Sequence, residues 1–248
     1  MKGAFFSRPL EWSIETQGET WQQGAVINGS LRVKNHGDDS ITLAQAGVAI
    51  AYADLKKVHA RADGALKPEV NQIFSQKIIA PGETLELIFS LPLKENCPIT
   101  DKKASYFLTY GRELAENHLM LKIDPKSLYG KIIGLLDTFS RFKLKEIKSA
   151  KTGVEYKLLP PTSREMANVE SLNLMMAMSG ETLQLNFDFQ VKKLDTASVT
   201  TKINKESVKI RRELSQKEYS LGRDMINQDQ LLKTIESVVS EVRMKSVF

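Results

Sequence analysis

The chain has 248 residues, of which 42% are hydrophobic and 26% are charged, and its formal net charge is +5 at pH 7. This composition excludes a disordered chain, because it supplies enough apolar surface for one large domain or two of ordinary size. It also excludes an internal disulfide and a transmembrane helix, since there is one cysteine and no run approaches the roughly 18 apolar residues of a membrane span.

The amino-terminal segment predicts two strands. Arg8-Pro9 interrupts the first apolar residues before a signal-peptide core forms, so we expect a protein retained in the cytoplasm. Apolar residues alternate with polar ones over 10–16 and again over 25–33, which is the period of a half-buried strand. Asn28-Gly29 is also typical of a hairpin turn. We favour one continuous strand in which another group packs close to the Gly29 backbone.

The next stretch predicts a central strand followed by a loop. Residues 41–55 are nearly continuous in apolar residues and rich in alanine, which indicates a strand covered on both faces. Residues 56–68 are polar and are interpreted as a loop, and residues 70–79 as another strand. With strands over 105–110 and 119–123, the first half has about seven strands, spaced as in a β-sandwich.

One strand pattern occurs twice in the chain. After the Pro81-Gly82 turn, apolar residues of a single parity continue to Leu91. The segment Gly82–Leu91 matches Gly180–Phe189, 98 residues later, with Gly, Glu, Thr, Leu, Leu and Phe at corresponding places. Since one β-sandwich has about 100 residues, this offset favours two sandwiches in tandem. The alternative is that Gly-Glu-Thr only marks a turn before a strand, because it also occurs at residues 18–20.

The second half begins with a change of period at Asp124-Pro125. Asp124 suits a helix N-cap, and an apolar stripe predicts a connector helix over 125–139. The stripe consists of Leu128, Ile132, Leu135 and Phe139. Strands resume at Phe142-Leu144 and over 154–158, and residues 171–191 predict a hairpin.

The last part of the chain gives weaker strand signals and then a helix. The weaker signals are Val199, Thr201, Ile203, Val208 and Ile210. A helical period returns over 228–244, with Asn227 or Asp229 as its cap. We therefore predict a mainly β fold of two tandem immunoglobulin-like sandwiches, with a connector helix and a C-terminal helix. The predicted domains are residues 1–124 and 125–248.

A set of motifs in this order resembles a known superfamily. The motifs are Gln23-Gly24 before Ile27-x-Gly29-x-Leu31-x-Val33, Ile79-Ala80-Pro81-Gly82-Glu83 before Phe89-x-Leu91-Pro92, Cys97-Pro98-Ile99-Thr100, and Tyr106-x-Leu108. They resemble the amino-terminal half of arrestin-like proteins. The helix after Asp124-Pro125 and the Phe142-Lys143-Leu144 strand are similar to the bacterial sporulation-control branch, although Ser140-Arg141 replace an expected glycine. The resemblance covers residues 20–160 and extends more weakly to 191. It implies tandem arrestin-like sandwiches that act as a scaffold or adaptor, with no chemistry of their own.

Residue types that support catalysis or metal binding are scattered along the chain. His36, His59 and His118 lie in three segments without the short spacing of metal ligands. Cys97 stands beside Pro98 in a loop and is interpreted as a buried or inert thiol. No nucleophile elbow, zinc-protease motif or phosphate-binding loop occurs. We therefore expect no enzyme activity, no metal and no cofactor.

The positive charge lies in the second half, with a balance of −1 over residues 1–124 and +6 over residues 125–248. Alternation with apolar residues predicts one basic stripe, and a second lies further along. Together they give six candidate partner-binding residues: Arg141, Lys143, Lys145, Lys209, Arg211 and Arg212. The stripes lack the interleaved aromatics of a single-strand nucleic-acid platform, which disfavours nucleic acid.

We therefore predict a non-enzymatic adaptor that binds protein partners, in bacterial cell-cycle, developmental or trafficking-like regulation. The alternative is a binder of acidic ligands, either nucleic acid or an anionic membrane surface contacted peripherally, through the basic second half. The terminal Ser246-Val247-Phe248 also resembles, weakly, a ligand for a pocket that holds a C-terminal carboxylate.

Overall fold

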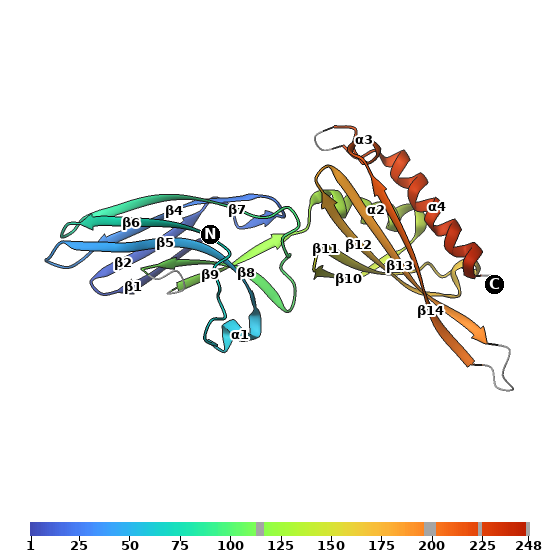
Figure 1. Cartoon of the computed structure of the whole chain (residues 1–248), viewed down its shortest axis with the longest axis horizontal. Coiled ribbons are helices and arrows are strands. Elements are labelled where there is room, and N and C mark those ends of the chain that lie inside the picture. Colours follow the sequence, from blue (N-terminus) through green and yellow to red (C-terminus); the bar gives the residue numbers. More distant parts are fainter. Residues whose placement is uncertain (113–116, 196–201, 223–224, 247–248) are drawn as a thin grey trace. The chain divides into compact units, whose positions relative to one another are not determined.

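The computed structural model describes residues 1–112, 117–195, 202–222 and 225–246. The chain divides into two compact units, Met1–Asp124 and Pro125–Phe248 (Figure 1). Most described residues are in strands, which agrees with the predicted mainly β fold class. The strand signals at Val199 and Thr201, and the terminal residues 247–248, lie outside the described residues.

The first unit is a sandwich of two sheets. The four-stranded sheet has the order β1 (Lys2–Ser7), β2 (Leu10–Thr16), β4 (Val26–Asn35) and β7 (Thr84–Pro92). The five-stranded sheet has the order β3 (Thr20–Gln22), β9 (Asn117–Asp124), β8 (Ala104–Gly111), β5 (Ile41–Asp54) and β6 (Val70–Ile79). All pairs are antiparallel except β3–β9. One continuous core joins both sheets, with Trp12 and Leu31 from the first and Val48 and Leu108 from the second.

The β4 strand shows why its glycine is needed. It runs without interruption from Val26 to Asn35, as predicted, and pairs with β2 and β7. A Cβ atom on Gly29 would lie 2.2 Å from the Glu15 carbonyl oxygen and 2.5 Å from Cζ of Phe89. Both distances are far below van der Waals contact. Gly29 therefore lets the β2 backbone and the buried Phe89 ring approach the β4 backbone.

The central strand β5 is buried on both faces, as predicted. Ile50 faces the sandwich core, and Ala51 on the opposite face is also fully buried. The prediction of a loop over residues 56–68 was partly wrong, because the short helix α1 (Leu55–His59) occupies its first residues. The Asp54 carboxylate caps α1 by accepting hydrogen bonds from two backbone N–H groups, and Val58 packs on Ala53 and Phe107.

The described residues of the second unit form one antiparallel sheet, in which the strands follow chain order. Its strands are β10 (Lys143–Ala150), β11 (Gly153–Leu159), β12 (Val169–Ser179), β13 (Thr182–Asp195) and β14 (Lys202–Leu214). The helical elements are α2 (Ser127–Ser140), η1 (Arg164–Met166), α3 (Gln216–Tyr219) and α4 (Gln228–Ser246). The β12–β13 hairpin turns at Gly180, which has a φ of +58°, and confirms the prediction for residues 171–191.

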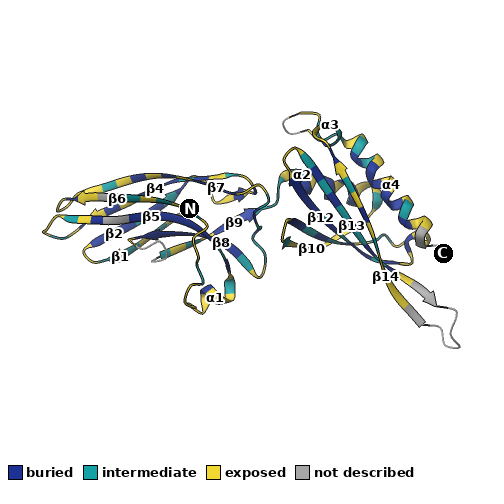
Figure 2. Ribbon diagram, in the orientation of Figure 1, coloured by how far each residue is buried: buried dark blue, intermediate teal, exposed yellow. Residues whose placement is uncertain are grey.

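Helices cover the buried face of this sheet and form the second layer of the unit. The α4 helix packs on β13 and β14, and α2 packs on β10 and on α4 (Figures 1 and 2). The sequence predicted both helices but not their role as a layer. It also placed the start of α2 too early, because the helix begins at Ser127 without a side-chain cap. Ile132 and Leu135 of the predicted stripe are buried, but Phe139 is 53% exposed. The buried face is completed by Tyr129, Ile133 and Leu136.

Candidate functional site

The structure does not keep the first predicted basic stripe on one face. Arg141 is the C-cap of α2 with a φ of 59°, so it lies before the strand rather than within it. Lys143 forms an ion pair with Asp137 of α2. Lys145 falls at the register shift between Leu144 and Glu146, which is a β-bulge. A bulge adds a residue to one strand and breaks the two-residue period on which the stripe was predicted.

The second predicted stripe is divided between the two faces of the sheet. Lys209 pairs across β13 with Asp188, and both are on the face that the helices leave open. Arg212 pairs with the buried Leu185 and therefore points to the helix-covered face. Its guanidinium nitrogen lies 2.9 Å from Oε2 of Glu241 on α4. Arg212 thus links β14 to α4 instead of joining Lys209 and Arg211 on the open face.

The Arg212–Glu241 ion pair is expected to stabilise the second unit. About a third of each side chain is exposed, so a double-mutant cycle with Arg212→Ala and Glu241→Ala should give a coupling free energy of about 0.5–1 kcal/mol. Urea unfolding of the four proteins measures it. The more exposed Arg211–Glu213 pair is the control, for which we expect about 0–0.5 kcal/mol. Equal couplings for both pairs would contradict the assigned packing.

Other cations of the second unit also have anionic partners. Lys148 Nζ lies 2.8 Å from Oε1 of Glu155, and the hydrogen bond between them raises the pKa of the Lys148 ammonium. Lys205 lies 2.8 Å from Glu170, and its hydrogen bond lowers the pKa of that carboxyl group. Arg243 lies 2.9 Å from Glu165. Six lysines and arginines of this half are therefore compensated locally by a carboxylate.

The outer face of the four-stranded sheet in the first unit carries a more organised set of side chains. Register places Lys2, Glu15, Ser30 and Ile88 in one row across the four strands. The next row consists of Ala4, Ser13, Arg32 and Glu86, and the third of Phe6, Glu11, Lys34 and Thr84. We call these twelve residues the first-sheet outer face.

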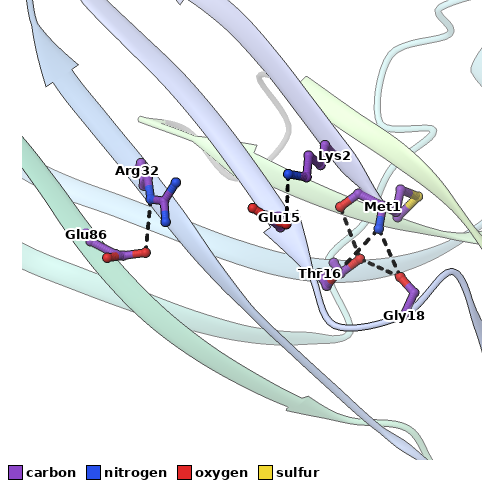
Figure 3. Close-up of polar contacts among 7 residues, drawn as sticks. All are labelled: Met1, Lys2, Glu15, Thr16, Gly18, Arg32 and Glu86. Atoms are coloured by element: carbon purple, nitrogen blue, oxygen red, sulfur yellow. Dashed lines mark hydrogen bonds and ion pairs between the residues drawn. The ribbon is translucent and has the colours of Figure 1, made fainter.

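Two ion pairs lie on the first-sheet outer face (Figure 3). Lys2 Nζ is 3.0 Å from Oε1 of Glu15, and Arg32 Nε is 3.0 Å from Oε1 of Glu86. The hydrogen bond from Lys2 lowers the pKa of the Glu15 carboxyl group. Each pair joins neighbouring strands, β1 to β2 and β4 to β7, so the charges have fixed places on the sheet.

Hydrogen bonds fix the start of β1 beside the end of β2. The Met1 amino group donates to the carbonyl oxygen of Gly18 at 3.0 Å, and Thr16 Oγ1 donates to the same oxygen at 3.0 Å (Figure 3). The Thr16 backbone N–H donates to the Met1 carbonyl oxygen at 2.9 Å. These contacts hold Lys2 in register opposite Glu15.

Small side chains make a depression between these charges. Its floor includes Ala4, Ser13 and Ser30, and its volume is about 420 Å³. Phe6 and Ile88 stand at diagonal corners of the first-sheet outer face and are 69% and 66% exposed. The His36 ring is tilted against the Phe6 ring, with centroids 6.2 Å apart, and its Nε2 lies 2.7 Å from Oε2 of Glu11. The face therefore combines two exposed apolar groups, a small-residue floor and paired charges.

Sequence reasoning missed the first-sheet outer face. Alternation within each strand gives the outward parity, but only cross-strand register shows which outward residues are neighbours. The available signal was the outward set of one strand, in which Lys2, Ala4 and Phe6 alternate with inward residues.

The described residues contain no group of three His, Cys, Asp or Glu side chains that could hold a metal ion. His118 lies edge-on to Phe107, with ring centroids 5.5 Å apart, and burial lowers its pKa. Cys97 is buried, as predicted, and its carbonyl oxygen accepts a hydrogen bond from the Gln23 side chain. In the part of the chain that the structure describes, no helix is long and apolar enough to cross a membrane.

Comparison with known proteins identifies a related fold. No family model and no curated protein sequence matches the chain. The fold is similar to the crystal structure of Spo0M, the sporulation control protein of Bacillus subtilis, with a TM-score of 0.63 and 13% identity over 94% of this chain and 98% of that one. An alkylpurine DNA glycosylase, AlkC of Pseudomonas fluorescens, gives a TM-score of only 0.29, with 10% identity over 46% of this chain and 30% of that one. The likeness to Spo0M shows that the two proteins share a fold over nearly the whole of both chains, which agrees with the fold that the sequence motifs predict.

Proposed function

We propose that this chain is a non-enzymatic scaffold or adaptor that binds protein partners. The name of its structural relative, a sporulation control protein, supports a regulatory role. We further propose that residues 1–124 and 125–248 are separate domains, each able to present a binding surface.

The first-sheet outer face is the observation that carries this proposal. Protein interfaces combine apolar or aromatic anchors with a polar rim, and a few anchors dominate the binding energy. Phe6 and Ile88 are exposed large apolar side chains on the same face. The depression between them is floored by Ser and Ala and can accept a partner side chain. The Lys2–Glu15 and Arg32–Glu86 pairs supply charges of both signs for a polar rim.

The distribution of charge in the chain fits a protein partner better than a polyanion such as nucleic acid or an anionic membrane. Binding of nucleic acid or anionic lipid needs several cations that act together, because counterion release drives such contacts. In the second unit, the six predicted basic residues are spread over both faces of one sheet and the end of α2. Three of them, Lys143, Arg211 and Arg212, already have carboxylate partners.

The test is capture of partners from native cells with a tagged full chain, followed by mass spectrometry. Phe6→Ser combined with Ile88→Ser should reduce recovery of the specific partners about tenfold or more, because loss of an interface anchor costs about 2 kcal/mol. Leu221→Ser combined with Met225→Ser is the matched control. These residues are 66% and 65% exposed in the second unit, and their substitution should leave recovery unchanged. Equal recovery with both double variants would contradict the proposal.

A further inference from the structure

A second surface of the first unit carries cations in a different setting. We define the α1 lobe as residues 54–69 together with the adjoining turn of residues 101–104. The Leu55 backbone N–H donates to the Lys103 carbonyl oxygen at 2.8 Å, which joins the two segments. The Glu69 N–H donates to the Ile50 carbonyl oxygen at 2.8 Å, which returns the chain to the sheet. The lobe projects from the sandwich and is mostly exposed (Figures 1 and 2).

The lobe gathers six exposed cations. They are Lys56, Lys57, Arg61, Lys67, Lys102 and Lys103. Among the residues that the structure describes, none of the six forms an ion pair. In the second unit, by contrast, six lysines and arginines form ion pairs with carboxylates.

Two carboxylates of the lobe, those of Asp54 and Asp101, are engaged by the backbone. Asp54 Oδ1 accepts from the N–H groups of Lys56 and Lys57 at 2.8 and 3.2 Å. Asp101 Oδ1 accepts from the N–H groups of Lys103 and Ala104 at 2.8 and 3.0 Å. Capping bonds of this kind keep each carboxylate against the chain. The lysine side chains beside them therefore extend to solvent with their charge available to a ligand.

A depression with both apolar and polar lining adjoins the cations, and Asn117 and His118 contribute to its polar part. It has a volume of about 510 Å³, and Val58, Ala65 and Leu66 contribute its apolar lining, with Arg61 and Asp63 beside them. Val58 is buried against Ala53 and Phe107, so the depression is fixed to the sheet. A ligand that fits the lobe therefore needs several negative charges and at least one small apolar group.

We propose that the α1 lobe binds an acidic segment of a partner protein, in which carboxylates alternate with aliphatic residues. Carboxylates would meet the six cations and an aliphatic side chain would enter the depression. This inference rests on the proposed adaptor function and names the partner chemistry of a second surface. A membrane is disfavoured because the lobe, all of which the structure describes, has no exposed large apolar side chain to insert. Nucleic acid is disfavoured because the lobe contains no Phe, Tyr or Trp side chain for base stacking.

The experiment measures fluorescence anisotropy of a labelled synthetic peptide of alternating Glu-Glu and Leu, with the full-length chain at low salt. The lobe variant is Lys56→Gln with Lys57→Gln and Arg61→Gln. We expect it to bind the peptide about tenfold more weakly or worse, because clustered charges act together on one ligand. The matched control removes the same number of charges from exposed positions of the second unit, by Lys151→Gln, Lys217→Gln and Lys233→Gln. We expect its affinity to stay within about twofold of the parent, because those cations lie outside the lobe.

Three competing probes decide between ligand classes. A peptide with Ser in place of Leu should bind less tightly, because it leaves the depression empty. Phosphatidylserine vesicles and single-stranded poly(U) should each bind more weakly than the Glu–Leu peptide at about 0.15 M salt, where exposed charge interactions are screened. The proposal is overturned if the lobe variant binds the peptide as well as the control variant does, or if vesicles or poly(U) bind more tightly than the peptide.

This experiment is separable from the test of the adaptor function. Loss of peptide binding in the lobe variant supports the lobe site whatever partner capture through Phe6 and Ile88 shows. Unchanged peptide binding overturns the lobe site, and partner capture that depends on Phe6 and Ile88 would then still support an adaptor. All three substituted residues are exposed, so far-UV circular dichroism and melting of the lobe variant should match the parent.

Discussion

Leu185→Asp is expected to unfold the second unit while the first stays folded, and Leu87→Asp is expected to do the reverse. Leu185 is fully buried between the sheet and the helices, and Leu87 is 6% exposed in the sandwich core. A carboxylate in either place should cost several kcal/mol, because burial disfavours its charged form and the Arg212 guanidinium across from Leu185 is already paired with Glu241. Hydrogen–deuterium exchange with mass spectrometry would localise the loss of protection to residues 125–248 or 1–124.

Outward positions of the same strands provide the controls. Asn186→Asp on β13 lies opposite Arg211, and Thr84→Asp on β7 lies opposite Lys34. Each puts the new charge on the outward face of its sheet beside a cation, so the free energy of unfolding should change by less than about 0.5 kcal/mol. If Leu185→Asp removes protection from both units, the proposed division into separate domains is wrong. If it removes protection from neither unit, the placement of Leu185 on the buried face of β13 is wrong.

The sequence predicted the strands well because a two-residue period is a local property. Leu183, Leu185, Phe187 and Phe189 alternate along β13, and all four are buried. The continuous apolar run of β5 likewise indicated burial on both faces, which Ala51 and Ile50 confirm. Only the chain's own side-chain spacing was needed for these predictions.

The sequence did not show which elements cover the buried face of a strand. The buried residues of β13 alternate in the same way whether a second sheet or helices pack on them. The helical layer of α2 and α4 could therefore be found only in the tertiary structure. The helix α1 was missed because one turn with one buried residue, Val58, has no visible period. The capping pattern of Asp54 before two backbone N–H groups was the available local signal.

The predicted basic stripes failed for a related reason. The bulge at Lys145 and the helix cap at Arg141 each break the two-residue alternation on which the first stripe was predicted. Neither feature has a clear sequence signal. Arg211 and Arg212 are neighbours in sequence and therefore point to opposite faces of β14. Surfaces such as the first-sheet outer face depend on register among four strands, which residue types alone do not specify.

Gly29→Ala is expected to destabilise the first unit by about 1–3 kcal/mol or more, the range for overpacking a close-packed core. The added methyl group would lie 2.2 Å from the Glu15 carbonyl oxygen and 2.5 Å from Cζ of Phe89. The carbonyl belongs to the β2 backbone and the ring is fully buried, so neither moves without loss of pairing or packing. Thermal unfolding followed by circular dichroism should show a lower Tm for the transition of the first unit.

The opposite result is expected for Gly134→Ala in α2, which provides the control. A Cβ atom on Gly134 would meet no heavy atom within 4 Å, and the residue is exposed inside the helix. Replacing an unconstrained helical glycine by alanine should therefore stabilise the second unit by about 0.5–1 kcal/mol, because the unfolded chain loses conformational freedom. The pair of variants thus moves the two transitions in opposite directions. A Gly29→Ala protein that melts like the parent would show that β2 and β4 do not pair in the register that brings Glu15 and Phe89 against Gly29.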